Sequence, residues 1–91
     1  MRYRVSARFD RSVGRLDPER KQRVQEAIDR LVAAFETGEL PRGLGLKQLR
    51  PRLWELRAGL SDRVLFYRAG GVVEFLAAGN HDEIARLLRT V

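Results

Sequence analysis

Apolar and polar residues alternate strictly at the start of the chain. Residues 2–9, RYRVSARF, place Tyr3, Val5, Ala7 and Phe9 on one side and basic or small polar residues on the other. A period of two is typical of a half-buried β-strand. The following residues, DRSVGRL, predict a short turn or helix.

From Asp17 onward the apolar residues recur at intervals of three and four, which predicts a long amphipathic helix. The apolar face consists of Val24, Ile28, Leu31, Val32 and Phe35. Asp17 suits the N-cap and Pro18 the first helical position. The helix is expected to stop near Thr37, because Gly38 readily adopts the left-handed conformation after a helix and Pro41 prevents continuation.

Residues 38–52, GELPRGLGLKQLRPR, contain three glycines, two prolines and four basic residues without a sustained period. This composition predicts a functional loop or a linker. Because a strand pattern follows at once, we do not expect a domain boundary here.

Three further segments have strand character: residues 52–58, 63–69 and 72–79. Gly70 and Gly71 predict a tight turn between the last two, so an antiparallel meander is expected. Asp82 is expected to cap a final helix, DEIARLLR. The order predicts an α+β domain with a small, antiparallel-rich sheet of about four strands, N-terminal helices packed on one face and a short C-terminal helix. The other face would stay partly open, where a residue such as Arg57 can project.

Length and composition narrow the possible classes. A chain of 91 residues is expected to form a single domain over residues 1–91. It has no cysteine and only one histidine, which argues against disulfides, structural zinc and any other metal site, and no cofactor is expected. No segment resembles a signal peptide or a membrane span, so we expect a cytoplasmic protein with no membrane partner.

The net charge of +6 is concentrated in one part of the chain. Seven basic and two acidic residues lie between Arg42 and Arg68, a net of +5, and the rest contributes only about +1. Such a concentration indicates a surface that meets nucleic acid or an acidic protein. The alternative is a solvated face in an arginine-rich protein.

Three segments, GLGLKQL, LWELRAGLSDRVLFY and AAGNHDEIARLL, in this order, resemble the RelE/ParE superfamily of bacterial toxins. The resemblance extends from Tyr3 to Leu88 and implies a microbial-RNase-like sheet fold. It also implies a toxin of a type II toxin–antitoxin system, with a cognate antitoxin as partner. RelE-like members cut mRNA in the ribosomal A site, whereas ParE-like members inhibit DNA gyrase and carry no RNase site.

RNA cleavage requires that a ribose 2′-OH lose its proton, that the 5′-oxygen gain one, and that extra charge on the phosphate be stabilised. Arginine suits the last task because its fork binds two phosphate oxygens. The resemblance implies catalytic roles for Arg57 and Lys47. Arg63 is either a phosphate ligand or a structural partner of Glu55 or Glu74. Whether Arg57 and Arg63 share a face depends on the hairpin register, which the sequence leaves open.

Histidine is the side-chain type best suited to donate and accept protons near neutral pH, so His81, the one histidine of the sequence, is a candidate catalytic residue. Its alternative role is to end a strand and begin a helix. Arg50 and Arg52 are expected to bind RNA phosphates. Some family nucleases use a C-terminal tyrosine that this chain lacks. Tyr67 and Trp54 are expected to pack within the sheet.

The favoured hypothesis is therefore a ribosome-dependent, metal-independent mRNA endonuclease that inhibits translation, with ribosome and mRNA as further partners and a toxin–antitoxin hetero-oligomer as its inactive form. A ParE-like gyrase inhibitor and a degenerate antitoxin-binding module remain alternatives. We expect the antitoxin to be acidic and amphipathic, and to cover part of the basic cluster and the exposed flank of the long helix.

Overall fold

A computed structural model describes residues 1–39 and 43–90. Its elements are, in chain order, β1 (Arg2–Val5), α1 (Ala7–Gly14), α2 (Pro18–Thr37), β2 (Leu46–Arg50), β3 (Leu53–Ala58), β4 (Asp62–Ala69), β5 (Val72–Asn80) and α3 (His81–Leu88). The predicted α+β class is confirmed. Pro41 and Arg42, which the sequence placed after the long helix, lie outside the described residues.

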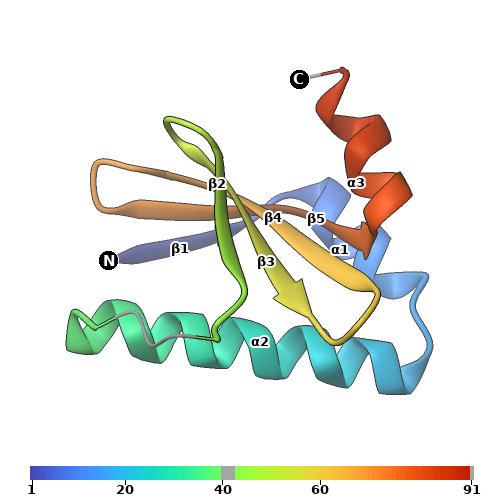
Figure 1. Ribbon diagram of the computed structural model, residues 1–91, viewed down its shortest axis with the longest axis horizontal. Coiled ribbons are helices and arrows are strands. Elements are labelled where there is room, and N and C mark those ends of the chain that lie inside the picture. The colour runs from blue at the N-terminus through green and yellow to red at the C-terminus, as the bar shows by residue number, and fades with distance from the viewer. Residues whose placement is uncertain (40–42, 91) are drawn as a thin grey trace.

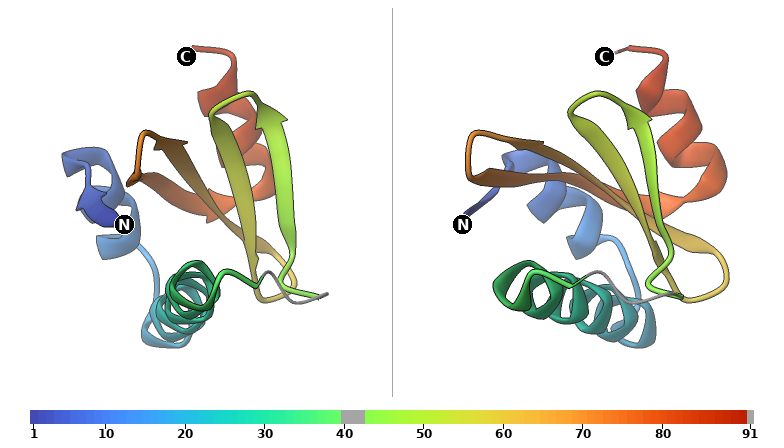
Figure 2. Two further views of the ribbon diagram at one scale, coloured as in Figure 1. Left: turned by 90° about the vertical axis from the view of Figure 1, so that its left-hand side faces the viewer. Right: turned by 60° about the vertical axis from the view of Figure 1, so that its left-hand side comes forward.

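The five strands form one mixed sheet in the order β1-β5-β4-β3-β2. β1 pairs with β5 in parallel, and the other three pairings are antiparallel. The long helix α2 runs across one face of this sheet, whereas α3 lies on the opposite face (Figures 1 and 2). The sheet is therefore a layer between two helices, with β1 and β2 at its edges.

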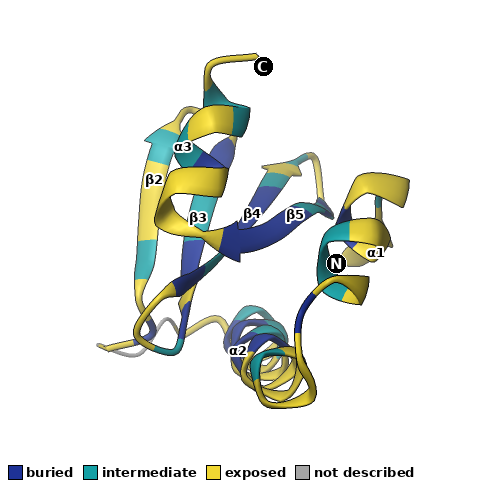
Figure 3. Ribbon diagram, turned by 90° about the vertical axis from the view of Figure 1, so that its right-hand side faces the viewer, coloured by how far each residue is buried: buried dark blue, intermediate teal, exposed yellow. Residues whose placement is uncertain are grey.

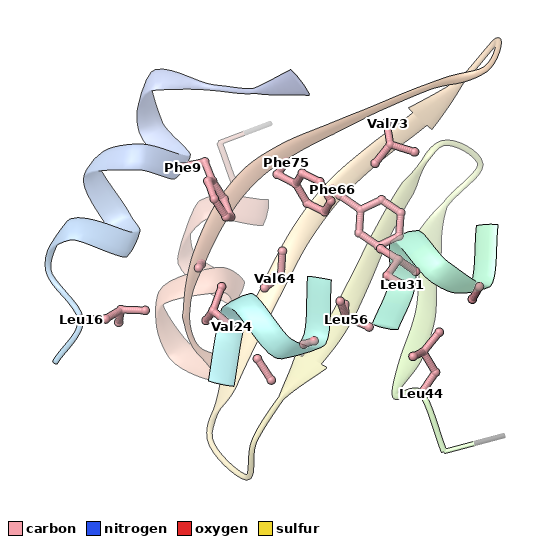
Figure 4. Packing of buried hydrophobic residues seen from close by; sticks show 14 residues of the cluster. Phe9, Leu16, Val24, Leu31, Leu44, Leu56, Val64, Phe66, Val73 and Phe75 are labelled. Atoms are coloured by element: carbon pink, nitrogen blue, oxygen red, sulfur yellow. The ribbon is translucent and has the colours of Figure 1, made fainter. Parts of the chain in front are cut away.

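The main core fills the space between α2 and the sheet. Val24 and Leu31 of α2 point toward Leu56, Val64 and other apolar side chains of the central strands (Figure 4). The face of α2 that meets the sheet is buried and its outer face is exposed (Figure 3). The caps confirm the predicted limits of this helix: the Asp17 carboxylate accepts from the Arg20 backbone N–H, and Gly38 has a φ of 77°.

The prediction of a strand through Phe9 was wrong, because the strand ends at Val5 and α1 begins at Ala7. Ser6 causes the change by capping α1, where its Oγ accepts from the Phe9 backbone N–H at 3.0 Å. A helix also brings Phe9 into the core, where its ring lies 5.8 Å from that of Phe75. Val5, predicted to face inward, is 54% exposed.

Helix α1 completes the edge of β5 beyond the end of the short strand β1. Ser6 Oγ donates to the Leu76 carbonyl, and Ser12 Oγ accepts from the Ala78 backbone N–H, both at 3.0 Å. These two serine bonds replace the partner strand, because an unpaired strand edge leaves backbone groups unsatisfied.

Two other predictions differ from the structure. Residues 46–50, expected to be loop, form β2, so the sheet has five strands and not about four.

The first turn of α3 begins at His81 with Asn80 as N-cap, because the Asn80 and Glu83 side chains each accept from the other's backbone N–H at 2.9 Å. Asp82, the predicted cap, is therefore inside the helix.

Candidate functional site

The β3–β4 hairpin sets two arginines side by side. Arg57 pairs directly with Arg63, and the loop between the strands comprises the three residues from Gly59 to Ser61. Direct pairing places both side chains on the same face, the one opposite α2. This register answers the question that the sequence left open.

Glu55 neutralises one of these two arginines. Its Oε1 lies 2.8 Å from Arg63 Nε, and both side chains are mostly buried, at 14% and 16% exposure. A second nitrogen of Arg63 donates to the Asp62 carbonyl at 3.0 Å. Arg63 is therefore the structural partner of Glu55, one of the alternatives raised by the sequence. The pair offsets the repulsion between like charges on opposite strand positions.

Arg57 and Lys47 are the exposed cations of this surface. Lys47 of β2 pairs with Glu55 of β3, so it lies diagonally from Arg57 on the same face, at a separation of about 7–8 Å between backbones. Both residues are exposed. Within residues 1–39 and 43–90, no hydrogen bond or ion pair engages either side chain. We call Lys47, Glu55, Arg57 and Arg63 the hairpin cluster.

The backbone beside Arg57 is tightly fitted. The Arg57 backbone N–H donates to the Gly45 carbonyl at 2.9 Å. Gly45 has a φ of 78°, and a Cβ on it would lie 2.7 Å from the Arg57 Cβ. Only glycine combines this backbone conformation with so close an approach. Gly45 thereby helps to fix the position from which the Arg57 side chain extends.

A buried ion pair holds the start of β4 against α2. Arg20 Nε donates to Asp62 Oδ2 at 2.9 Å, and Arg20 Nη2 donates to Oδ1 at 2.7 Å. The Asp62 side chain is 1% exposed. The hydrogen bonds from Arg20 lower the pKa of Asp62 below its ordinary value despite burial, which acts in the opposite direction. This bidentate contact anchors the hairpin next to Arg63.

His81 lies at the same end of the sheet as the arginine pair. Arg63 pairs with Gly79, and Asp62 with Asn80, so His81 follows two residues after the position opposite Arg63. Its side chain is 75% exposed, and its Nδ1 lies 3.5 Å from Asp82 Oδ1. No hydrogen bond joins it to the hairpin cluster in the described part of the chain.

Arg50 and Arg52 lie apart from the other candidates, at the turn that joins β2 to β3. Arg50 donates to the Leu88 carbonyl at 3.0 Å and so ties β2 to the end of α3. Arg52 donates to the Tyr67 hydroxyl at 3.4 Å. Both residues border an apolar hollow of about 370 Å³ lined by Arg50, Pro51, Arg52, Leu53, Tyr67 and Leu76.

The two aromatic residues near the site confirm the predicted packing only in part. Trp54 is half-buried and packs against the main core, on the α2 face. Tyr67 is half-buried on the opposite face, where it borders the hollow. The hairpin cluster and this hollow therefore occupy one face of the sheet.

Among the described residues, no group of three histidine, cysteine, aspartate or glutamate side chains is placed to hold a metal ion. None of the described helices has the length and apolar character needed to cross a membrane.

Solved structures with similar folds include toxins and toxin–antitoxin complexes. A chain of the RelB–RelE antitoxin–toxin complex of Methanococcus jannaschii superposes with a TM-score of 0.71 at 13% identity, over 92% of this chain and 96% of that one. YafQ from E. coli has a TM-score of 0.63 at 12% identity, over 92% and 98%. The RelBE2 toxin–antitoxin complex of Mycobacterium tuberculosis gives 0.52 at 22% identity, over 88% and 96%.

No known family profile matches the sequence, and no curated protein matches it significantly. The fold is nevertheless that of the RelE-like toxins, and the similarity extends over nearly the whole of both chains. The predicted resemblance is thus confirmed at the level of the fold.

One group of basic residues was not predicted from the sequence. Arg8, Arg11 and Arg15 follow each other at intervals of three and four on and just after α1, and they border a groove between α1 and α3. The helical spacing of these arginines was the available signal. It was obscured because Arg8 also fits the alternating pattern of the predicted strand, whereas Arg11 and Arg15 lie in the segment predicted as a turn or short helix.

Proposed function

We propose that this chain is the toxin of a type II toxin–antitoxin system and that it cleaves mRNA on the ribosome. The observation that carries the proposal is the guanidinium of Arg57, which no side chain of residues 1–39 and 43–90 engages, beside the neutralised Arg63, on an open sheet face of a RelE-like fold. A phosphate that approaches this face meets a free cation next to a rigidly held one. That arrangement suits the extra negative charge of a phosphoryl transition state.

The proposed roles of the individual side chains follow from their exposure and their position in the sheet. Arg57 binds two oxygens of the scissile phosphate with its fork, and Lys47 adds a second mobile charge. Arg63, neutralised by Glu55, keeps the hairpin beside Arg57 in place and is not itself a phosphate ligand. His81, exposed beside the same strand ends, is the candidate to transfer a proton to or from the ribose or leaving oxygen.

The hollow between the β2–β3 turn and Tyr67 extends the proposed RNA surface. A nucleobase is a flat apolar ring system, and aromatic side chains with nearby arginine cations bind such rings in single-stranded RNA. In this proposal Arg52 contacts the backbone of a nucleotide bound there; Arg50 and Arg52 both border the hollow. The RNA would then run from the hollow toward Arg57.

The cognate antitoxin is the proposed protein partner. Two of the similar structures were solved as toxin–antitoxin complexes. A cytoplasmic nuclease that acts on every translating ribosome must be held silent, and a bound acidic protein accomplishes this by covering basic surface.

The test is to add the purified chain to ribosomes programmed with a defined mRNA and to map the new 3′ and 5′ ends. We expect cuts at the codon in the A site, and none in the same mRNA without ribosomes. Uncut message at a large molar excess of the chain would refute the nuclease.

Two companion assays distinguish the remaining alternatives. Inhibition of DNA gyrase supercoiling without mRNA cleavage would assign the chain to the ParE-like class. Expression in a bacterial host without any growth defect would favour a degenerate antitoxin-binding module. A growth defect with cleaved mRNA is the outcome that we expect.

A further inference from the structure

A groove runs between α1 and α3 on the side of β5 away from the hairpin cluster, where Figure 3 shows the two helices flanking the strand. It consists of two hollows of about 190 and 280 Å³ that share Arg8, Arg11 and Leu87 in their walls. Each is smaller than the roughly 300 Å³ at which small-molecule sites begin. Two such hollows in line suit successive side chains of a polypeptide segment.

The floor of the groove is apolar. It is formed by Leu65, Leu76, Ala77, Ile84 and Leu87, which come from two strands and α3. Ser6 and Ser12 also line it, but their hydroxyls already bond to the β5 backbone. Leu65, Ala77 and Ile84 are buried, whereas Leu76 and Leu87 are half-buried. The floor therefore offers contact to apolar side chains mainly through these two leucines, and little to polar ones.

The α1 wall of the groove is strongly basic. Arg8, Arg11 and Arg15 all border it, and no hydrogen bond or ion pair engages their side chains within residues 1–39 and 43–90. Glu83 is the acidic residue in the lining, and its Oε1 accepts from the Asn80 backbone N–H of its own chain. From Arg8 to Arg15 the wall extends about 10 Å, which is two helical turns or three extended residues.

We propose that this groove binds an acidic, amphipathic segment of the partner protein, with apolar side chains in the two hollows and carboxylates against the three arginines. The partner is the antitoxin, so this inference rests on the proposed function. The inference extends the proposed function by locating a second contact surface for the antitoxin, away from the hairpin cluster. The binding mode combines buried apolar anchors with charge pairs at the rim.

An RNA strand is the other polyanion that three arginines attract. Phosphates gain nothing from an apolar floor, however, and the bases of a strand whose backbone follows the arginines need flat surfaces wider than these hollows. A segment with both carboxylates and aliphatic side chains is complementary to the wall and to the floor. The groove composition therefore favours a protein segment over RNA.

The experiment measures binding of the chain to the small protein encoded beside its gene, by biolayer interferometry at two salt concentrations. The test variant is Arg8→Glu/Arg11→Glu, and the matched control is Arg2→Glu/Arg30→Glu, which reverses two exposed charges outside the groove. Circular dichroism verifies that both variants are folded. Cleavage of mRNA on ribosomes is measured in parallel.

We expect the test variant to bind at least about tenfold more weakly, with a smaller salt dependence, and the control to change by less than about twofold. Both should retain nuclease activity. In the ¹⁵N-labelled wild-type chain, the partner should shift amide signals of α1 and α3.

Equal affinity of both variants would overturn the groove assignment and leave the proposed function intact. Lost nuclease activity with unchanged partner binding would reassign the groove to RNA. If the neighbouring protein does not bind the wild-type chain, the antitoxin part of the proposed function fails together with this inference, while mRNA cleavage still decides the enzyme part.

Discussion

Arg57 and Arg63 occupy directly opposite positions on β3 and β4, yet Glu55 lies against Arg63 alone, at 2.8 Å. Two arginines that look equivalent in the sequence therefore have different roles. Arg63 is part of the folded framework, whereas Arg57 projects from that framework with a guanidinium that no residue in the described part of the chain engages. A residue that binds phosphate needs a guanidinium without a carboxylate partner, because a guanidinium already paired with a carboxylate attracts a phosphate only weakly.

Arg57→Ala should lower mRNA cleavage about 100-fold or more, the loss typical of removing one donor to a charged transition state. Arg57→Lys should recover only part of the activity, because a point charge lacks the bidentate fork. Single-turnover cleavage on programmed ribosomes measures both. Arg2→Ala, an exposed arginine on β1, is the matched control and should behave as wild type.

Antitoxin affinity of Arg57→Ala should fall only moderately, because binding is spread over many contacts. Full activity with abolished antitoxin binding would show that Arg57 belongs to the protein interface and not to a phosphate site.

Glu55→Gln should lower the free energy of unfolding by about 2 kcal/mol, because it removes a charged hydrogen bond and leaves two arginines facing each other. Urea denaturation measures the change. Glu74→Gln is the control, since Glu74 forms no ion pair among the described residues, and it should change stability by less than about 0.5 kcal/mol.

The double variant Glu55→Gln/Arg63→Gln should lose less stability than the sum of the single variants, because the two groups interact directly. Losses of unfolding free energy that are strictly additive would contradict a stabilising interaction between Glu55 and Arg63.

Gly45→Ala should reduce stability by about 2 kcal/mol or more and lower cleavage, because its Cβ would meet the Arg57 Cβ at 2.7 Å. Gly43→Ala separates the conformational cost from the steric clash: its φ of 85° is also positive, but no atom of the described residues lies within 4 Å of the added Cβ. The control should thus show the conformational cost of about 1 kcal/mol with normal activity. Equal losses in both variants would exclude the proposed steric effect on Arg57.

Asp62 should make stability depend on pH in the acid range. Arg20 lowers the pKa of the Asp62 carboxyl in the folded protein, so the stabilisation is fully present above the unfolded-state pKa of about 3.9 and is lost as pH falls through the lower folded-state value. Urea denaturation between pH 7 and pH 2 should show a decline that is shallower in Asp62→Asn. Asp29→Asn, at an exposed position on α2, should retain the wild-type slope.

Arg20→Ala at pH 7 should cost about 3 kcal/mol, because it leaves the Asp62 carboxylate buried and unpaired. Arg20→Met/Asp62→Ala should recover part of this loss. A double variant that is no more stable than Arg20→Ala would contradict the unpaired charge as the cause.

Tyr3→Phe should stabilise the fold by about 1 kcal/mol, because the buried Tyr3 hydroxyl has no hydrogen-bond partner in the described part of the chain. Burial and the nearby Glu36 also raise the pKa of this phenol, so it stays neutral. Thermal unfolding measures the effect. Tyr67→Phe is the control, because the Tyr67 hydroxyl accepts from Arg52 at 3.4 Å and its removal should not stabilise the fold. A destabilised Tyr3→Phe variant would indicate that the hydroxyl is satisfied in solution.

Local sequence determined the elements whose signals lie within a few residues. The limits of α2 followed from Asp17, Pro18 and Gly38, and the β4–β5 turn from Gly70 and Gly71, because caps and turns depend on short-range backbone chemistry. The α+β class and the RelE-like order of elements followed from these signals together.

Tertiary structure decided how segments that are far apart in the sequence pair and pack. Residues 46–50 carry a weak strand signal, and they are extended because β3 offers them an edge to pair with. Residues 7–9 fit a strand by alternation, but Ser6 caps a helix there and β5 accepts that helix along its edge. The separate roles of Arg57 and Arg63 depend on hairpin register and on the position of Glu55. Such pairings are set by packing across the sheet, and the period of the sequence alone does not contain them.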